Sequence, residues 1–191
     1  MEWRLGPGLA LVILLGAGCA TTSTAVGSAA LRQGRPAEAV AQFEKALAED
    51  PGRLDALIGL GISRYRLGTY DEAIAALADA VTRAPEHPAA RLYLALSHVR
   101  KREDAKAEEQ LTALRALPLE QRFVALVDQA LELLRAGGLT DPVRTYLVAS
   151  LDYGADWSRE LAETRMALRT AQLHWDPFWA RPTYIIRCRN C

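Results

Sequence analysis

Residues 54–87 read LDALIGLGISRYRLGTYDEAIAALADAVTRAPEH, and the 34 residues before them carry the same pattern. The shared positions are Gly34, Ala39, Ala46 and Pro51, which return as Gly68, Ala73, Ala80 and Pro85. A fixed period of this length is typical of proteins built from stacked repeats. Because each repeat only extends the surface of its neighbour, such arrays usually present a binding surface rather than a catalytic pocket.

Each copy of the pattern predicts two helices joined by a tight turn. Within residues 54–87, Gly61 is small enough to let two helices approach closely, and Gly68 opens the turn. Proline cannot continue a helical ladder, so Pro85 ends the second helix. One face of that helix is formed, at helical spacing, by Ala73, Leu77 and Ala80.

The same segment resembles a tetratricopeptide repeat. Its first helix contains Leu57-x-x-Leu60-Gly61, followed by Tyr65 a turn later, and Leu57 stands where the family usually has Trp. The resemblance implies an all-α fold: a short right-handed α-solenoid of helix hairpins with C-terminal capping helices and an irregular tail. It also implies that the chain binds other proteins.

We predict three repeats within a domain of residues 19–121, at 20–53, 54–87 and 88–121. Residues 21–27 are poor helix material, so the first helix is expected to form only toward residues 27–33. The third copy is degenerate, because Arg102 replaces the turn glycine. Three units meet the rough minimum for a stable stack.

Beyond the repeats, residues 122–174 predict a non-consensus helical hairpin and a capping helix, which an array needs at its open end. We expect Gly154 to break the chain there and Asp156 to cap a last helix that ends near His174. Residues 175–191 are expected to be irregular. Their aromatic residues either cap the solenoid or form an exposed partner-binding or membrane-interface patch: Trp175, Phe178, Trp179 and Tyr184.

The N-terminus has the pattern of a secretory signal. Residues 9–15 form an unbroken apolar run, too short to span a bilayer, followed by small residues that end at Cys19. The segment before Cys19 resembles a bacterial lipobox, although Gly16 stands where a large aliphatic residue is preferred. The resemblance implies a signal peptide at residues 1–18, removed in the mature protein, and lipidation of Cys19. An ordinary secreted protein cleaved nearby is the alternative.

A lipid on Cys19 would tether the mature chain in the periplasm. In well-known lipoprotein systems, an Asp after the cysteine retains the protein at the inner membrane. Here that residue is Ala20, which points to the periplasmic side of the outer membrane.

In tetratricopeptide stacks, the first helix of each repeat lines a concave face. The resemblance therefore implies a partner-binding groove lined by Ile58, Ile62, Tyr65, Arg66, Leu92, Leu96 and Arg100. An apolar trough edged by arginines can seat an amphipathic helix or an extended segment, and favours an acidic partner. Two alternatives remain: the arginines are an ordinary family feature, or the chain's own C-terminal helix fills the trough. A carboxylate clamp is not supported, because its places hold Ile58, Ile62, Leu92 and Leu96.

No pattern in the chain predicts catalysis, a cofactor or a metal site. Acidic and basic residues number 23 each, which gives no electrostatic case for nucleic acid. Cys188 and Cys191 form a terminal CxxC, which we interpret as a disulfide or an accident of sequence. A single pair of this kind is a weak zinc signal, and a redox role needs a helix N-terminus that is not predicted here.

The leading hypothesis is a membrane-anchored periplasmic lipoprotein that is not an enzyme. Its repeats would act as an adaptor or scaffold for another envelope protein in envelope assembly, secretion, pilus biogenesis or polysaccharide export, an analogy that comes from architecture alone. A second hypothesis is a small redox or enzymatic module from about Arg122 onward, carried by the repeats. A third is a structural homo-oligomer in which repeats stack between protomers.

Overall fold

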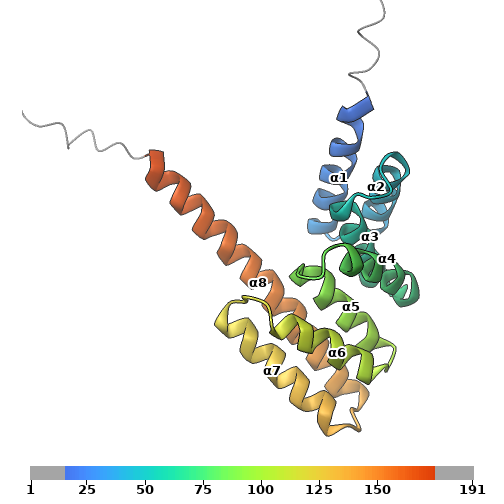
Figure 1. The fold of residues 1–191 in the computed structure, drawn as a ribbon, viewed down its shortest axis with the longest axis vertical. Helices are drawn as coiled ribbons and strands as arrows, with labels where there is room; N and C mark the ends of the chain where they lie inside the picture. Colours follow the sequence, from blue (N-terminus) through green and yellow to red (C-terminus); the bar gives the residue numbers. More distant parts are fainter. Residues whose placement is uncertain (1–15, 175–191) are drawn as a thin grey trace, which may run out of the picture.

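A computed structural model describes the backbone of residues 16–174 and the side chains of residues 23–156, 164 and 166. This part of the chain contains eight α-helices and no strand (Figure 1). The predicted signal peptide lies mostly outside the described residues, and the predicted tail 175–191 lies entirely outside them. The helices are α1 (Gly16–Arg32), α2 (Pro36–Glu49), α3 (Leu54–Leu67), α4 (Tyr70–Arg83), α5 (Pro88–Arg100), α6 (Asp104–Arg115), α7 (Gln121–Ala136) and α8 (Asp141–His174).

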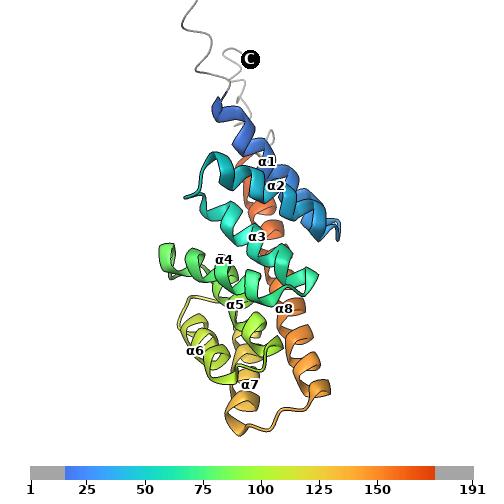
Figure 2. The same ribbon diagram turned by 90° about the vertical axis from the view of Figure 1, so that its right-hand side faces the viewer.

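Successive helices pack as hairpins that stack along the long axis of the molecule, from α1 and α2 at one end to α7 at the other (Figure 2). The helix pairs α1/α2, α3/α4 and α5/α6 are the three hairpins expected from the repeat pattern. The all-α solenoid prediction is therefore confirmed. The last helix, α8, packs against α7 and α5, and its later part extends away from the stack (Figure 1).

Two positions show how the repeat sequence determines the hairpin. A Cβ atom at Gly61 would lie 2.4 Å from Leu77 Cγ, so the missing side chain lets α3 and α4 pack closely. Gly68 follows α3 with φ of 81°, a backbone conformation that glycine adopts without strain. The third hairpin uses the same left-handed turn at Arg102, with φ of 61°. The loss of the glycine therefore does not change the turn.

The predicted start of the first helix was wrong. Helix α1 begins at Gly16 and includes the residues that were expected to be poor helix material. Ser23 and Thr24 are both buried, and α1 packs along α2. Tertiary packing of this kind overrides a weak intrinsic preference for helix.

The predicted helix break at Gly154 was also wrong. Gly154 lies inside α8, which is 34 residues long and continues through this position. A Cβ atom at Gly154 would lie 2.5 Å from Leu126 Cδ1 and 3.1 Å from Phe123 Cδ2. The glycine lies where α8 crosses α7, and its small size serves that close approach. Asp156 consequently lies inside α8 and does not cap a separate helix.

Candidate functional site: a concave face in two sections

The residues predicted to line the groove lie on α3 and α5, the first helices of the second and third hairpins. The apolar members and Tyr65 are buried, whereas Arg66 and Arg100 are exposed. The face that they form divides into two sections. The section on α5 is covered by α8, which we call the filled section; the section between α1 and α3 contains a pocket, which we call the open section.

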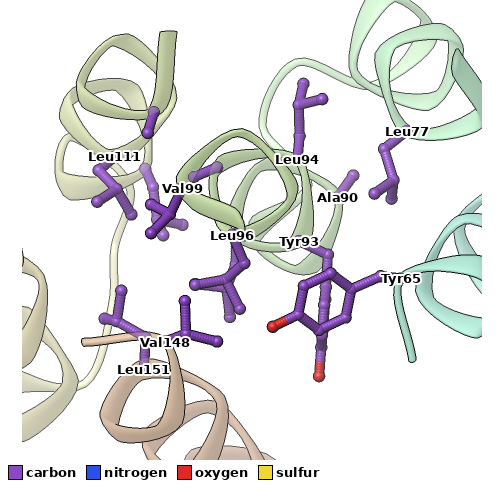
Figure 3. Packing of buried hydrophobic residues seen from close by; sticks show 14 of the residues in the cluster. Tyr65, Leu77, Ala90, Tyr93, Leu94, Leu96, Val99, Leu111, Val148 and Leu151 are labelled. Carbon is purple, nitrogen blue, oxygen red and sulfur yellow. The ribbon is translucent and has the colours of Figure 1, made fainter. Parts of the chain in front are cut away.

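The apolar contacts of the filled section come from the first turns of α8. Val148 and Leu151 face Leu96 and Val99 of α5 (Figure 3). Leu96, Val99 and Leu151 are completely buried. The first part of α8 thus lies on the concave face as a bound helix would, so the chain fills this part of its own groove. This is one of the alternatives that the sequence left open.

Acidic residues of α8 pair with polar residues along the same section. The Tyr93 hydroxyl donates to Asp152 Oδ1 at 2.6 Å, and Arg66 Nη2 donates to the Tyr93 hydroxyl at 3.4 Å. Arg66 Nη2 also lies 3.7 Å from Asp152 Oδ1 and 3.8 Å from Asp156 Oδ2. The groove arginine therefore has an acidic partner, and this partner belongs to the same chain.

These contacts shift the ionisation of the two groove tyrosines. Burial, aided by the negative charge of Asp152 and opposed by Arg100, raises the pKa of Tyr65 to about 12. Burial and Asp152 also raise the pKa of Tyr93. The two rings meet edge to face with centroids 5.3 Å apart. Both phenols stay neutral at physiological pH and act as hydrogen-bonding groups.

Two arginine–aspartate pairs attach the start of α8 to the third hairpin. Arg144, almost buried, donates to Asp104 of α6 through its two terminal guanidinium nitrogens, and the bond from Nη2 measures 2.7 Å. The bond from Arg144 holds the pKa of the Asp104 carboxyl below its usual range. Arg102 donates to both oxygens of Asp141 at 2.7 and 2.8 Å, and this pair is exposed. Neither pair could be predicted from the sequence, because each joins residues about forty positions apart.

The open section is a pocket of about 260 Å³ between α1, α3 and the start of α5. It is lined by Ser28, Leu31, Arg32, Phe43, Asp55, Ile58, Gly59, Ile62 and His87. Ile58 and Ile62 were predicted as groove residues, whereas His87 was not. The backbone N–H of Ala90 donates to His87 Nδ1 at 3.3 Å, and burial lowers the pKa of His87.

The structure therefore separates the predicted groove residues. Ile58 and Ile62 line the pocket; Leu96 is covered by α8 and Arg66 is paired with its acidic residues. Arg100 acts on Tyr65, whose pKa it lowers against the effects of burial and Asp152. The missed residues are Asp152 and Asp156, whose role depends on where α8 lies in the fold.

Other predicted sites fall on α1 or outside the described residues. The backbone of Cys19 lies in the first turn of α1, and Cys188 and Cys191 lie outside the described part. Among the described residues, no group of three or more metal-binding side chains is gathered. None of the described helices combines the length and the apolar character needed to cross a bilayer.

Comparisons with known proteins agree with this architecture. The first TPR domain of human RPAP3 has 17% sequence identity and a TM-score of 0.54, with 62% of this chain and 97% of that one covered. The first TPR of Spaghetti (RPAP3) bound to an HSP90 peptide has 18% identity, a TM-score of 0.53 and coverages of 60% and 94%. No curated protein matches this chain closely enough to count as a relative.

A bacterial structure is similar to the same degree. The type III secretion chaperone SycD of Yersinia enterocolitica, in complex with a peptide of the translocator YopD, has 21% identity and a TM-score of 0.57; 61% of this chain and 92% of that one are covered. The family model for the tetratricopeptide repeat matches residues 24–85 and 58–120, together just over half of the chain. The repeat pattern, the hairpin stack and the family match agree, and the chain belongs to the tetratricopeptide repeat family.

Proposed function

We propose that this protein is an adaptor that holds a segment of another protein in the open section of its concave face. The observation that carries the proposal is the contrast between the two sections. Helix α8 covers the apolar residues of α5, whereas the equivalent residues of α3 line a pocket of about 260 Å³. An apolar groove of this kind binds a helix or an extended segment by burying its apolar side chains.

The similar solved structures support a peptide as the occupant. SycD was solved with a peptide of the translocator YopD, and the Spaghetti repeat domain with a peptide of HSP90. Both have the same helical-hairpin architecture as this chain. A peptide segment of a partner protein is therefore the class of ligand that we assign to the open section.

We further propose that the adaptor works in the cell envelope. The apolar run of residues 9–15 and the lipobox-like segment before Cys19 support export and lipid attachment. Cleavage before Cys19 would remove only the first three residues of α1. The adaptor would then act at the periplasmic side of the outer membrane, in assembly, secretion, pilus or polysaccharide-export machinery.

Photo-crosslinking in the native host tests the adaptor role. A benzoylphenylalanine probe at Asp55, which is exposed and lines the pocket, is expected to trap one dominant partner. The matched control places the same probe at Ala75, an exposed position on α4 away from the pocket. Equal products from both probes, or none from either, would contradict the proposal.

Metabolic labelling with a tagged fatty acid tests the anchor. The wild-type chain is expected to take up the label and to move to the membrane fraction, and Cys19→Ala is expected to lose both properties. Equal labelling of wild type and variant would show that the lipobox resemblance is misleading.

A further inference from the structure

We propose that the open section binds an amphipathic helix that carries acidic residues beside its apolar face, the same chemistry that α8 presents to the filled section. This inference rests on the proposed function, because it names the class of segment that the adaptor binds. Its basis is the repeat itself: two sections built from equivalent residues, of which one is seen with its occupant.

The two sections correspond residue by residue at an offset of 34. Leu92 and Leu96 of the filled section correspond to Ile58 and Ile62 of the open one. Arg66, which supplies the positive charge of the filled section, corresponds to Arg32. In each section the apolar residues come from one hairpin and the arginine from the hairpin before it.

The occupant of the filled section shows what such a set of residues binds. Helix α8 places Val148 and Leu151 on the apolar residues of α5. It places Asp152 and Asp156, one turn apart, within 4 Å of Arg66. This groove thus recognises two apolar residues that lie three positions apart. An acidic residue directly follows the second of them, and another lies four positions further on.

The open section has the residues for the same pattern but no described acidic partner. Arg32 lines the pocket and is exposed, and no described side chain forms an ion pair with it. Asp55 and His87 also line the pocket, so a ligand carboxylate is expected to approach from the Arg32 side, away from Asp55. An acidic residue of the partner would therefore complete a pair that Arg66 already makes within the chain.

One substitution between the sections changes the expected contact. Gly59 stands where the filled section has Tyr93, whose hydroxyl donates to Asp152. The acidic residue of a partner would lack this phenol and would depend on Arg32 alone. Loss of the arginine should therefore weaken the ionic part of the binding free energy more in the open section, where it is Arg32, than in the filled section, where it is Arg66.

The basic end of the chain is a poor match for the same place. Residues 181–191 contain Arg181, Arg187 and Arg189 and no acidic side chain. Their charge has the same sign as that of Arg32. Charge complementarity therefore favours a segment of another protein over this end of the chain.

The test uses a fluorescent, helix-stapled peptide with the sequence of residues 143–158, which carries both the apolar and the acidic positions of α8. Its binding to the full chain in detergent is measured by anisotropy. We expect Arg32→Glu to weaken binding at least tenfold, since attraction becomes repulsion. The matched control is Arg35→Glu, the same charge change at an exposed residue that does not line the pocket, and it should leave binding unchanged.

A charge exchange shows whether the contact is direct. A peptide with Asp152→Arg and Asp156→Arg should bind wild type at least tenfold more weakly than the parent peptide, and should recover most of this loss on Arg32→Glu. Thermal melting, monitored by circular dichroism, shows whether each variant is folded. Recovery on a folded variant requires the ion pair and does not follow from a structural effect of Arg32.

Several results would overturn the inference. These are no binding of the parent peptide, equal binding by Arg32→Glu and wild type, or a loss seen only with Arg66→Glu, which would mean that the peptide exchanges with α8. The crosslinking experiment separates this failure from that of the adaptor role. A single partner trapped from Asp55 through a segment without acidic residues would leave the adaptor role intact and remove only this inference.

Discussion

Leu96 and Ile62 occupy the same place in successive repeats, yet their surroundings differ. Leu96 is 0% exposed beneath α8, whereas Ile62 is 9% exposed and lines the pocket. Arg66 and Arg32 differ in the same way, because only the former has acidic partners among the described residues. The repeat therefore determines which residues form the groove, and the element packed on it determines whether the groove is available.

The largest expected effect is on stability in the filled section. Leu96→Ala should lower the free energy of unfolding by about 4 kcal/mol, because it leaves a cavity under α8 that cannot collapse. Ile62→Ala should cost about 2 kcal/mol, because its side chain already borders open space. Urea unfolding of both variants checks the difference. Equal losses would show that the two sections are filled alike.

The second prediction concerns the attachment of α8. Asp104→Asn should cost about 2–3 kcal/mol, because it leaves the nearly buried Arg144 without its counter-charge. The pKa of Asp104 is lowered when folded, so this contribution is present at neutral pH and is lost as the pH falls through the folded value. The free energies of unfolding of wild type and Asp104→Asn, measured by urea unfolding, should therefore converge as the pH is lowered.

The control for that variant is Asp141→Asn. It breaks the exposed pair with Arg102 at the first turn of α8, and should cost less than about 1 kcal/mol. Hydrogen exchange in the first turns of α8 should rise more in the Asp104 variant. A larger effect from Asp141→Asn would mean that the exposed pair holds the helix in place.

A pair of glycine substitutions compares the repeat scaffold with its occupant. Gly61→Ala should cost about 1–2 kcal/mol, because the new methyl group meets the fully buried Leu77. Gly154→Ala should stay within about 0.5 kcal/mol of wild type, because a gain in helix propensity of about 1 kcal/mol offsets a contact with the end of Leu126. Thermal unfolding measures both. A large loss at Gly154 would mean that Leu126 and Phe123 cannot move aside, so that α7 and α8 pack as tightly as α3 and α4.

The smallest effect is expected from pH at the rim of the open section. Burial lowers the pKa of His87, so the unfolded chain binds a proton there more tightly than the folded one. The contribution of neutral His87 to the free energy of unfolding is therefore complete above the usual histidine pKa of about 6.5. It is lost as the pH falls from there through the folded pKa. His87→Asn, which keeps a side chain suited to a helix N-cap, should reduce this loss, by less than about 1 kcal/mol. Parallel unfolding series from pH 7.5 to 5.5 provide the measurement, and identical slopes would contradict it.

The repeated part of the fold could be predicted from sequence because the same information appears there more than once. Glycine, alanine and proline at an offset of 34 indicate the turn, the contact face and the end of the first two hairpins. These are local constraints, and the structure has the expected helices at α2 to α6. The concave positions followed from the resemblance, since each helix has a known place in such a stack.

The remainder depends on contacts between distant segments. Gly154 is compatible with a break or with close packing, and only the position of Phe123 and Leu126 on α7 decides between them. In the sequence, Asp152 looks like an ordinary solvated residue and Asp156 like a helix cap, and only the position of α8 places both beside Arg66. Occupancy of the groove is a tertiary property, because it depends on where α8 packs.

The length of α8 has a mechanical consequence. The helix is held at its beginning by α5, α6 and α7, and the 18 residues after Asp156 extend for roughly 27 Å at 1.5 Å per residue. A rotation of about 10° at the held end would displace the far end by about 5 Å, given that length. Helix α8 thus has the geometry of a lever, in which a small change in the packing of the groove becomes a displacement as large as a helical turn.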